Sequence, residues 1–397
     1  MLLRLAVAAE TLRQLRRVDV SDIGPVTGGP NGLCNEPSTA RAHNRKECPV
    51  KRVLTTTCVV GAAIAMLGAA HAQTAAAPPA SNAVPVTVDN FVRAESDMYV
   101  NALAKQGCLG KFLHRREPAS IAHQTVIRLN RDTLYSSGVF DLDAGPVTIT
   151  MPDPGKRFMA MQVINEDHYT PNVFYGAGTH VLTRENVGTR YTVVAIRTLV
   201  DPGSPDDIKE VHVLQDGVKV SQAGPGKLET PNWDKASQKK VRDALLILAS
   251  TIPDFKGAFG TKDEVDPVRR LVGAAAAWGG NPDKDATYLN FTPSRNDGKT
   301  IYKLSAKDVP VDGFWSISVY DAKGYYEPNA AGAYSLNNVT AKKGADGSIE
   351  VQFGDCDGKT VNCLPITPVW NYMVRLYRPR PEVLNGNWHF PEAQPAS

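Results

Sequence analysis

A group of polar side chains near the end of the first third of the chain has the composition of an anion-binding site. The group comprises Arg128, Asn130, Arg131 and Asp132, and Tyr135 follows it in a segment that alternates like a β-strand. An arginine fork binds a carboxylate or a phosphate through two parallel hydrogen bonds. We therefore predict that these five residues contact a carboxylate, a phosphate or a sugar. The alternative is an Arg–Asp pair that bridges two strands at a corner and serves only the fold.

Glu166 and His168 form a second group, because a carboxylate and an imidazole are both metal ligands. They lie shortly before Pro171 in a predicted loop, and His123 or His180 would be a further ligand. The sequence contains no H-E-x-x-H or comparable spacing, so the ligand spacing gives a metal no support. The alternative is a solvated loop with one histidine.

Aromatic residues are frequent in the last third of the chain and suit sugar rings or other flat apolar ligands. They are Trp315, Tyr320, Tyr325, Tyr326 and Trp370. Tryptophan and tyrosine are also ordinary strand residues, so core packing is the alternative for at least half of them. Tyr325 and Tyr326 precede Glu327-Pro328 in a predicted loop, and we predict that these two contact a ligand.

Several functional classes are disfavoured by the sequence. It has no G-x-S-x-G elbow, which speaks against a serine hydrolase of the α/β type. It has no P-loop and no dinucleotide fingerprint after a strand, so no nucleotide cofactor is expected. Nine of the 44 basic and five of the 41 acidic residues precede position 73, and the remaining chain is close to neutral. Without clustered Lys and Arg, no nucleic-acid partner is expected.

Residues 1–72 are predicted to be absent from the mature protein, with a secretory signal over about 50–72. Lys51-Arg52 precedes the apolar segment 53–67, and Ala70-His71-Ala72 provides small residues at the cleavage site. The apolar segment is shorter than the roughly 20 residues that span a bilayer. We therefore predict a periplasmic or secreted protein without a membrane span in the mature chain; a retained membrane anchor is the alternative. A signal this far into the chain suggests a start site near Val50 or Val53.

The mature chain contains three cysteines. Cys356 and Cys363 are separated by six residues and predict a local disulfide across a turn, which an oxidising compartment favours. A zinc site is the alternative, but no second cysteine pair or nearby histidine provides the other ligands. Cys108 is left over and is predicted to be a buried thiol.

The first half of the mature chain predicts a β-sandwich. Residues 73–86 are a linker rich in Ala and Pro, and a helix follows that Thr87 would cap. From position 125 the apolar period changes to two, with turn signals between the segments. Strands are predicted over 134–142, 147–151, 157–164, 173–182 and 191–199, with a weaker candidate at 211–214. Short strands at regular spacing indicate an antiparallel sandwich over 87–225.

The second half predicts a helical unit over 226–285 and another β domain over 286–397. Helices are expected over 232–251 and from Asp266-Pro267, a cap and first-turn proline, to about Trp278. Strands are expected over 287–291, 300–304, 314–320, 349–353 and 370–377. In the last strand one apolar face alternates with a mixed face, which predicts a sheet with a single dry side. Trp388 and Phe390 are expected to hold the Pro-rich tail.

Two blocks of sequence resemble known families. Residues 130–136 (NRDTLYS), 146–152 (PVTITMP) and Arg157-Phe158 resemble domain of unknown function 1254. Residues 312–321 (DGFWSISVYD), 370–378 and 387–391 (NWHFP) resemble domain of unknown function 1214. The resemblance implies an immunoglobulin-like sandwich, a helical insert and a C-terminal jelly roll. It implies no established activity.

The sequence therefore predicts a mainly β protein with an immunoglobulin-like sandwich, a small helical middle unit and a C-terminal jelly-roll sandwich. Our functional hypothesis is a binding or accessory protein for a small polar or carbohydrate-like ligand held between the two sandwiches. One alternative is an enzyme of unassigned type, metal-assisted, with a polar site near Asp132, Glu166 and His168. Another is an envelope structural or interaction protein. A homo-oligomer is compatible with each.

Overall fold

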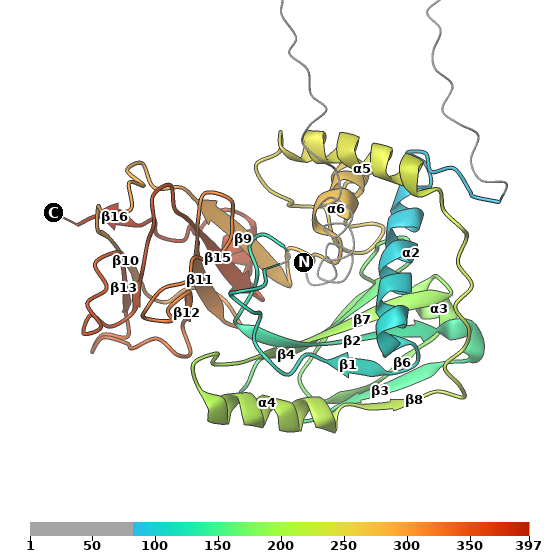
Figure 1. Cartoon of the computed structure of the whole chain (residues 1–397). Helices are drawn as coiled ribbons and strands as arrows, with labels where there is room; N and C mark the ends of the chain where they lie inside the picture. Colours follow the sequence, from blue (N-terminus) through green and yellow to red (C-terminus); the bar gives the residue numbers. More distant parts are fainter. Residues whose placement is uncertain (1–81, 125, 397) are drawn as a thin grey trace, which may run out of the picture. The chain divides into compact units, whose positions relative to one another are not determined.

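The computed structural model describes residues 82–124 and 126–396 and is mainly β, as predicted (Figure 1). Its described residues form sixteen strands in four sheets, together with a few helices. The sheets belong to two sandwiches, each with its own apolar core. The predicted signal, and the linker as far as residue 81, lie outside the described residues.

The first sandwich packs a five-stranded sheet on a three-stranded sheet, and every strand pair in it is antiparallel. The larger sheet has the order β1-β2-β7-β4-β5, with β1 Phe112–His114, β2 Thr133–Asp141, β7 Tyr191–Leu199, β4 Met159–Asn165 and β5 Asn172–Tyr175. The smaller sheet has the order β6-β3-β8, with β6 Gly178–Leu182, β3 Val147–Met151 and β8 Lys219–Ser221. Phe140, Ile149, Met161 and Ile196 belong to the core between them.

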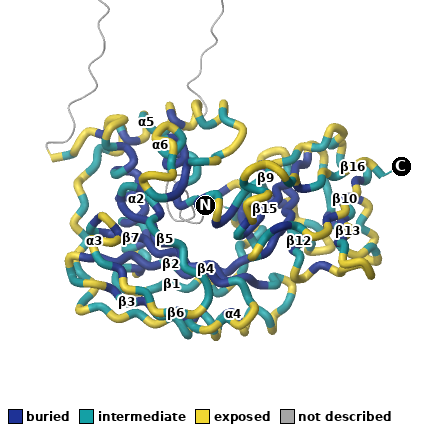
Figure 2. The backbone as a smooth tube through the Cα atoms, turned by 180° about the vertical axis from the view of Figure 1, so that it is seen from behind, coloured by how far each residue is buried: buried dark blue, intermediate teal, exposed yellow. Residues whose placement is uncertain are grey.

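The three central strands of the larger sheet are buried on both faces, as the dark tube in Figure 2 shows. The outer face of these strands carries two rows of side chains, and a different part of the protein packs against each row. Val139, Val193 and Ile164 form one row, against which the helix α2 (Phe91–Leu103) packs. The second row, four residues along β2, begins with Tyr135 and faces the second sandwich.

The helices largely follow their start signals. They are α3 Arg184–Val187, α4 Pro205–Gly217, α5 Lys235–Ala249, α6 Pro267–Ala277 and α7 Pro381–Leu384, besides α2; the π-turn η1 (Ala104–Cys108) and the 3₁₀ turn η2 (Leu142–Ala144) are shorter. Asp266 caps α6 by accepting from the Arg269 N–H at 2.8 Å, as predicted.

Three local predictions were wrong. The single strand predicted over 173–182 is two strands, β5 and β6, which lie in different sheets. The first helix begins at Phe91, not Thr87, whose N–H instead donates to the Asn90 side chain. The weak strand at 211–214 lies inside α4, which Ser204 caps and Pro205 starts. The helix cap and the first-turn proline determine the structure here, and not the alternation of Val211 and Val213. Only Val211 is buried, as expected for one face of a helix.

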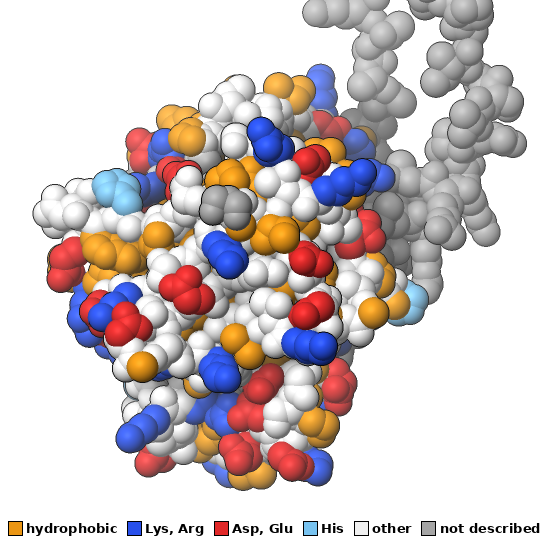
Figure 3. All heavy atoms as spheres, turned by 90° about the vertical axis from the view of Figure 1, so that its left-hand side faces the viewer, with side chains coloured by type: hydrophobic (Ala, Val, Ile, Leu, Met, Phe, Trp, Pro, Cys, Tyr) orange, Lys and Arg blue, Asp and Glu red, His pale blue; other side chains and the backbone are white. Residues whose placement is uncertain are grey.

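The second sandwich packs the sheet β14-β13-β10-β16 on the sheet β12-β11-β15-β9. The strands are β9 Ala286–Phe291, β10 Tyr302–Ala306, β11 Trp315–Tyr320, β12 Ser335–Asn337, β13 Ile349–Phe353, β14 Cys363–Leu364, β15 Asn371–Tyr377 and β16 Gln394–Pro395. The tail is held as predicted, because Phe390 is buried against Trp315 and β16 pairs with β10. Acidic and basic side chains are interspersed on the face shown in Figure 3.

The predicted Cys356–Cys363 disulfide is confirmed, and Cys108 is a buried free thiol. No helix among the described residues is long and apolar enough to cross a membrane.

The expectation of a single dry side for the sheet that contains β15 was wrong. All seven residues of β15 are buried, including the mixed face that carries Arg375 and Tyr377. That face is covered by the first sandwich, whose residues 128–130 contact it directly. The polar cluster that opened the sequence analysis therefore lies where two sheet faces meet.

Candidate ligand-binding site

The first sandwich contributes one row of side chains to the place where the faces meet. The strand register pairs Tyr135 with Arg197, Arg197 with Ala160, and Ala160 with Tyr175. Neighbouring strands lie about 4.8 Å apart, and directly paired residues project from the same face. The row therefore presents a phenol, a guanidinium, a methyl group and a second phenol in succession.

The second sandwich contributes two tyrosines from neighbouring strands. Tyr288 on β9 pairs with Arg375 on β15, and Tyr377 follows Arg375 by two residues on the same face. The Asn130 side-chain amide donates to the hydroxyls of Tyr135 and Tyr377, at 3.1 and 3.0 Å. Asn130 thus joins one hydroxyl from each sandwich.

Arg197 is the charged residue of this group and is 6% exposed. Its guanidinium donates to the Gln162 side chain at 2.8 Å and to the Gly279 carbonyl at 3.4 Å, and it lies 5.5 Å from the Tyr135 ring centroid. Burial, the largest influence, lowers the pKa of Arg197, but the surrounding tyrosines offset it and the net shift is upward. None of the ion pairs formed by the described residues includes Arg197.

The group around Arg197 has more hydrogen-bond donors than acceptors. The hydroxyls of Tyr135 and Tyr377 accept from Asn130, and the Tyr288 hydroxyl accepts from Asn281 at 2.8 Å. Within residues 82–124 and 126–396, none of these three hydroxyls donates to a protein acceptor. A tyrosine hydroxyl has one proton to donate. We call Arg197 with Tyr135, Tyr288 and Tyr377 the donor cluster.

A neighbouring group, centred on Arg375, has more hydrogen bonds to protein atoms. Its guanidinium donates to the Leu129 carbonyl at 3.1 Å, to the Arg128 carbonyl at 3.0 Å and to the Tyr320 hydroxyl at 2.6 Å. The Tyr320 and Tyr326 hydroxyls also donate to the Leu129 carbonyl, at 2.7 and 2.8 Å. This network fastens residues 128–129 to the second sandwich, so we call it the latch.

Asp132 is fully buried and faces strands β11 and β12. Burial is the main cause that raises its pKa, whereas Arg375, Ser316, Ser335 and Asn337 lower it. Neither carboxyl oxygen makes a hydrogen bond of standard geometry with a described residue. The polar side chains of the two strands surround the carboxyl group, which is therefore part of the junction between the sandwiches.

The other predicted arginines stack on tyrosines instead of pairing with Asp132. The Arg128 guanidinium lies 5.7 Å from the Tyr320 ring centroid, and that of Arg131 lies 5.5 Å from Tyr334. Arg131 also donates to the Ala119 carbonyl. The described residues contain no Asp132 ion pair with either arginine, so the alternative of a strand-bridging Arg–Asp pair was wrong.

Glu166 does not join this site, and His168 is linked to it through Gly279, whose N–H donates to His168 and whose carbonyl accepts from Arg197. Asp132 accepts from Val200 at one end of β7, whereas Glu166 accepts from the Tyr191 N–H at the other end. Nine residues of strand separate the two ends by about 30 Å. A single active site that contains Asp132, Glu166 and His168 is therefore incompatible with this sheet.

The local surroundings of Glu166 and His168 are those of fold-supporting groups. Arg93 pairs with Glu166 at 3.5 Å, and the His168 Nε2 accepts from the Gly279 N–H at 2.9 Å. Burial lowers the pKa of His168 to about 3, so it is neutral at physiological pH. The described part of the chain has no group of three or more His, Cys, Asp or Glu placed to hold a metal ion.

The predicted loop aromatics have different environments. Tyr326 is 2% exposed and belongs to the latch. Tyr325 is partly exposed, and its backbone N–H donates to the Asp321 carboxylate. The structure thus brings together Arg128, Asn130, Asp132, Tyr135 and Tyr326, and leaves Tyr325 at the edge.

Sequence reasoning missed Arg197, Arg375, Tyr288 and Tyr377. Arg197 did leave a signal, because it is the one charged residue in the segment 193–199, which is apolar apart from Arg197 and Thr198. A buried charge must be paired or hydrogen-bonded, so such an interruption of a central strand marks a special environment. The tyrosines resembled ordinary strand residues, and only the register shows that they converge.

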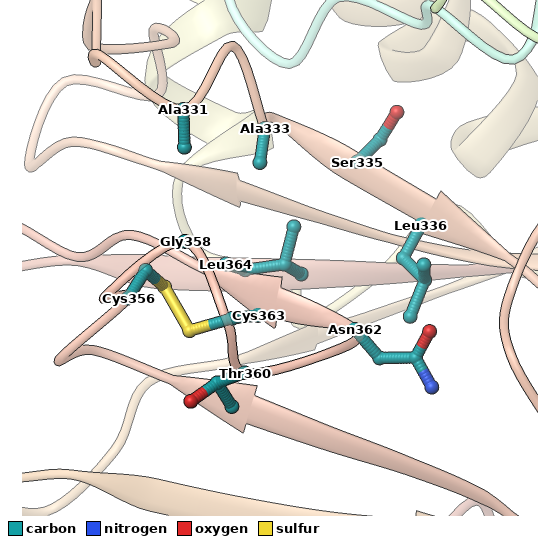
Figure 4. Close-up of a pocket in the computed structure, with 10 residues that line it drawn as sticks. All are labelled: Ala331, Ala333, Ser335, Leu336, Cys356, Gly358, Thr360, Asn362, Cys363 and Leu364. Carbon is teal, nitrogen blue, oxygen red and sulfur yellow. A yellow bond between two sulfur atoms is a disulfide. The ribbon is translucent and has the colours of Figure 1, made fainter.

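A separate pocket of about 350 Å³ lies in the second sandwich, beside the disulfide (Figure 4). Its lining includes Leu336, Leu364 and Asn362 and contains no charged side chain. The Asn362 amide is already bonded to backbone groups of Lys342 and Glu350. The pocket thus offers little specific chemistry, and the donor cluster is the stronger candidate.

Comparison with known proteins identifies two family regions. Residues 109–191 match the protein family of unknown function DUF1254, and residues 287–381 match the family of unknown function DUF1214. No curated protein matches the chain.

Solved structures are similar to this chain at low sequence identity, and the first of the two that follow shows the fold. The crystal structure of the VPA0106 protein from Vibrio parahaemolyticus aligns with a TM-score of 0.62 and 16% identity, over 78% of this chain and 98% of that chain. An uncharacterized protein from Burkholderia cenocepacia aligns with a TM-score of 0.43 and 12% identity, over 77% and 86% of the two chains.

Proposed function

The chain carries a DUF1254 region followed by a DUF1214 region, and for a protein of this tandem type we propose a binding function. The ligand is a small molecule with an anionic oxygen group, such as a carboxylate, held by the donor cluster. The observation that carries this proposal is the surplus of donors around Arg197, a buried cation without an ion-pair partner among the described residues.

The energetic argument compares the free and bound protein. Removal of a charged group from water is costly unless a counter-charge or hydrogen bonds compensate for it. Only neutral groups meet Arg197 from the protein: the Gln162 side chain, the Gly279 carbonyl and the Tyr135 side chain. A carboxylate would provide the counter-charge and would accept from the tyrosine hydroxyls. Hydrogen bonds between ionised partners are about twice as strong as neutral ones.

The contrast between the two arginines separates binding from scaffolding. Arg375 has its donors engaged by carbonyl and hydroxyl oxygens, so its environment is that of a fold-supporting residue. Arg197 lies on β7 of the first sandwich and has fewer hydrogen-bond partners in the protein. The latch holds the two sheet faces together, and the donor cluster provides the chemistry between them.

We further propose a periplasmic or secreted location. The basis is the signal-like segment that ends near Ala72 and the Cys356–Cys363 disulfide, since oxidising compartments favour disulfides. An anion-binding protein in that compartment would act as a binding or accessory protein.

A thermal-shift titration tests the binding proposal. Sodium acetate, sodium butanoate, sodium phosphate and glucose are compared with sodium chloride at constant ionic strength. We expect at least one oxyanion to raise the melting temperature, because a ligand at 100 times its Kd stabilises the native state by about 2.7 kcal/mol. Glucose represents the neutral sugar and is expected to have no effect.

Arg197→Met is the diagnostic variant, because methionine fills a similar volume without the charge. It should fold with a melting temperature close to that of the wild type, since a buried ionic group is often replaced by an apolar residue at little cost. Its oxyanion response should be lost. Tyr302→Phe is the matched control, because this buried tyrosine accepts from the Arg295 N–H far from the cluster. An equal oxyanion response in Arg197→Met and the wild type contradicts the proposal.

A further inference from the structure

A second polar group lies at the other end of the row that contains Arg197. The Tyr175 hydroxyl donates to the Asp285 Oδ1 at 2.6 Å. Asp285 is 8% exposed, and its Oδ2 is buried without a hydrogen-bond partner among the described residues. The Asp285 Oδ2 is thus a buried acceptor in the neighbourhood of the donor cluster. A ligand with only an anionic group would not bind this acceptor.

The sheet fixes the spacing between these two ends. β4 lies between β7 and β5, so the backbone positions of Arg197 and Tyr175 are about 10 Å apart. The residue between them is Ala160, whose side chain is a single methyl group. The charge of Arg197 is among the causes that lower the pKa of Tyr175, so the two groups are within electrostatic reach.

Other charges at the acceptor end are few. The Arg378 guanidinium lies 4.6 Å from the Tyr175 ring centroid, and Lys284 and Glu264 contribute opposite charges near Asp285. None of the ion pairs in residues 82–124 and 126–396 includes Asp285. Its free oxygen is therefore available to a hydrogen-bond donor.

From this arrangement we infer that the ligand is bifunctional, a short amino acid or hydroxy acid. This inference rests on the binding function proposed above. Its carboxylate binds the donor cluster, and its ammonium or hydroxyl group donates to the Asp285 Oδ2.

The test compares three probes that differ in one group: butanoate, 4-aminobutanoate and 4-hydroxybutanoate. Their dissociation constants are measured by isothermal titration with the full mature chain. We expect 4-aminobutanoate to bind at least about tenfold more tightly than butanoate, because hydrogen bonds between charged groups are the strong ones. 4-Hydroxybutanoate should lie between them.

Asp285→Asn identifies the group responsible. Asparagine retains an oxygen that accepts from Tyr175 but loses the charge. The preference for 4-aminobutanoate over butanoate should fall to about twofold or less. Asp283→Asn is the matched control, because Asp283 lies two positions away and accepts from the Gly257 N–H. It should leave the preference intact.

The outcomes separate the two proposals. If no probe binds, the binding function itself is wrong. If butanoate binds as tightly as 4-aminobutanoate, the donor cluster binds anions but the bifunctional ligand is refuted. The same conclusion follows if Asp285→Asn weakens both ligands equally. The comparison of probes on the wild type does not depend on whether the variant folds.

Discussion

Asp97 on helix α2 is a buried carboxyl group whose protonation should control stability. It is 1% exposed, and its Oδ2 accepts from the Trp233 indole N–H at 2.7 Å. Its pKa is raised from 3.8 to about 7, mainly because burial removes water, with a further contribution from the charge of Glu166. The Trp233 hydrogen bond and the charge of Arg93 oppose this shift.

The sign and size of the effect follow from linkage. Between pH 4 and pH 7 the folded protein retains the Asp97 proton, whereas the unfolded chain has lost it. The free energy of unfolding therefore falls as the pH rises through this window. A shift of about three pKa units corresponds to a loss of about 4 kcal/mol, complete above pH 7.

Asp97→Asn mimics the protonated carboxyl group, since the amide oxygen still accepts from Trp233. The variant should match the wild type near pH 4 and exceed its unfolding free energy by up to about 4 kcal/mol at pH 8. The measurement is urea denaturation followed by tryptophan fluorescence at several pH values. A difference between variant and wild type that does not change with pH would refute the reasoning, because Asp97 would then be ionised throughout.

Glu95 is the matched control on the same helix, and its substitution should have the opposite sign. It is also 1% exposed, but Arg242 donates to its carboxylate at 2.9 Å. Glu95→Gln leaves Arg242 without its counter-charge, and breaking such a buried pair costs about 3 kcal/mol at neutral pH. Two equally buried carboxylates would thus respond oppositely because only one has a dominant cationic partner.

Three further substitutions test the framework around the site. Arg375→Lys should lower the free energy of unfolding by about 3 kcal/mol in urea denaturation, because an ammonium does not reproduce the fork that reaches Ser318 and the 128–129 carbonyls. Replacement of both Cys356 and Cys363 by serine should cost about 2 kcal/mol, and reduction of the wild type should have the same effect. Gly226→Ala should lower the melting temperature far more than Gly257→Ala. Both glycines have positive φ, which costs an alanine about 1–2 kcal/mol. Only at Gly226 would the new Cβ lie 2.4 Å from Asp141.

The order of strands and helices was largely predictable because each has a local cause. The strands at 147–151 and 349–353 alternate cleanly, and Asp266-Pro267 combines a cap with a first-turn proline. The single dry side predicted for the last sheet failed for a non-local reason. Arg375 donates to the Leu129 carbonyl, which lies 246 positions away in the sequence. The periodicity within a strand does not reveal that a segment so distant in sequence packs on its face.

The candidate site was predictable only in part, for a related reason. Asn130 and Tyr135 were identified from a local run of polar residues; Tyr135 belongs to the donor cluster, and Asn130 donates to two of its hydroxyls. Tyr288 and Tyr377 belong to strands whose aromatic residues suit a core equally well, so their side-chain types were uninformative. The charge of Arg197 within an apolar strand was the one local signal that was overlooked.

The family-characteristic segment 130–136 serves the fold and the site at once, which affects how function must be tested. It follows the Leu129 carbonyl, which accepts hydrogen bonds from the latch residues Arg375 and Tyr326. It also contains Tyr135, a member of the donor cluster, and Asn130, which donates to that cluster. A substitution there changes both the junction of the sandwiches and the proposed ligand contacts, so lost binding would be ambiguous. Arg197 makes no contact in the latch, whereas Tyr288 packs against the cluster that contains Leu129, Tyr320 and Tyr326. Substitution of Arg197 therefore separates binding from folding, which the segment's own residues do not allow.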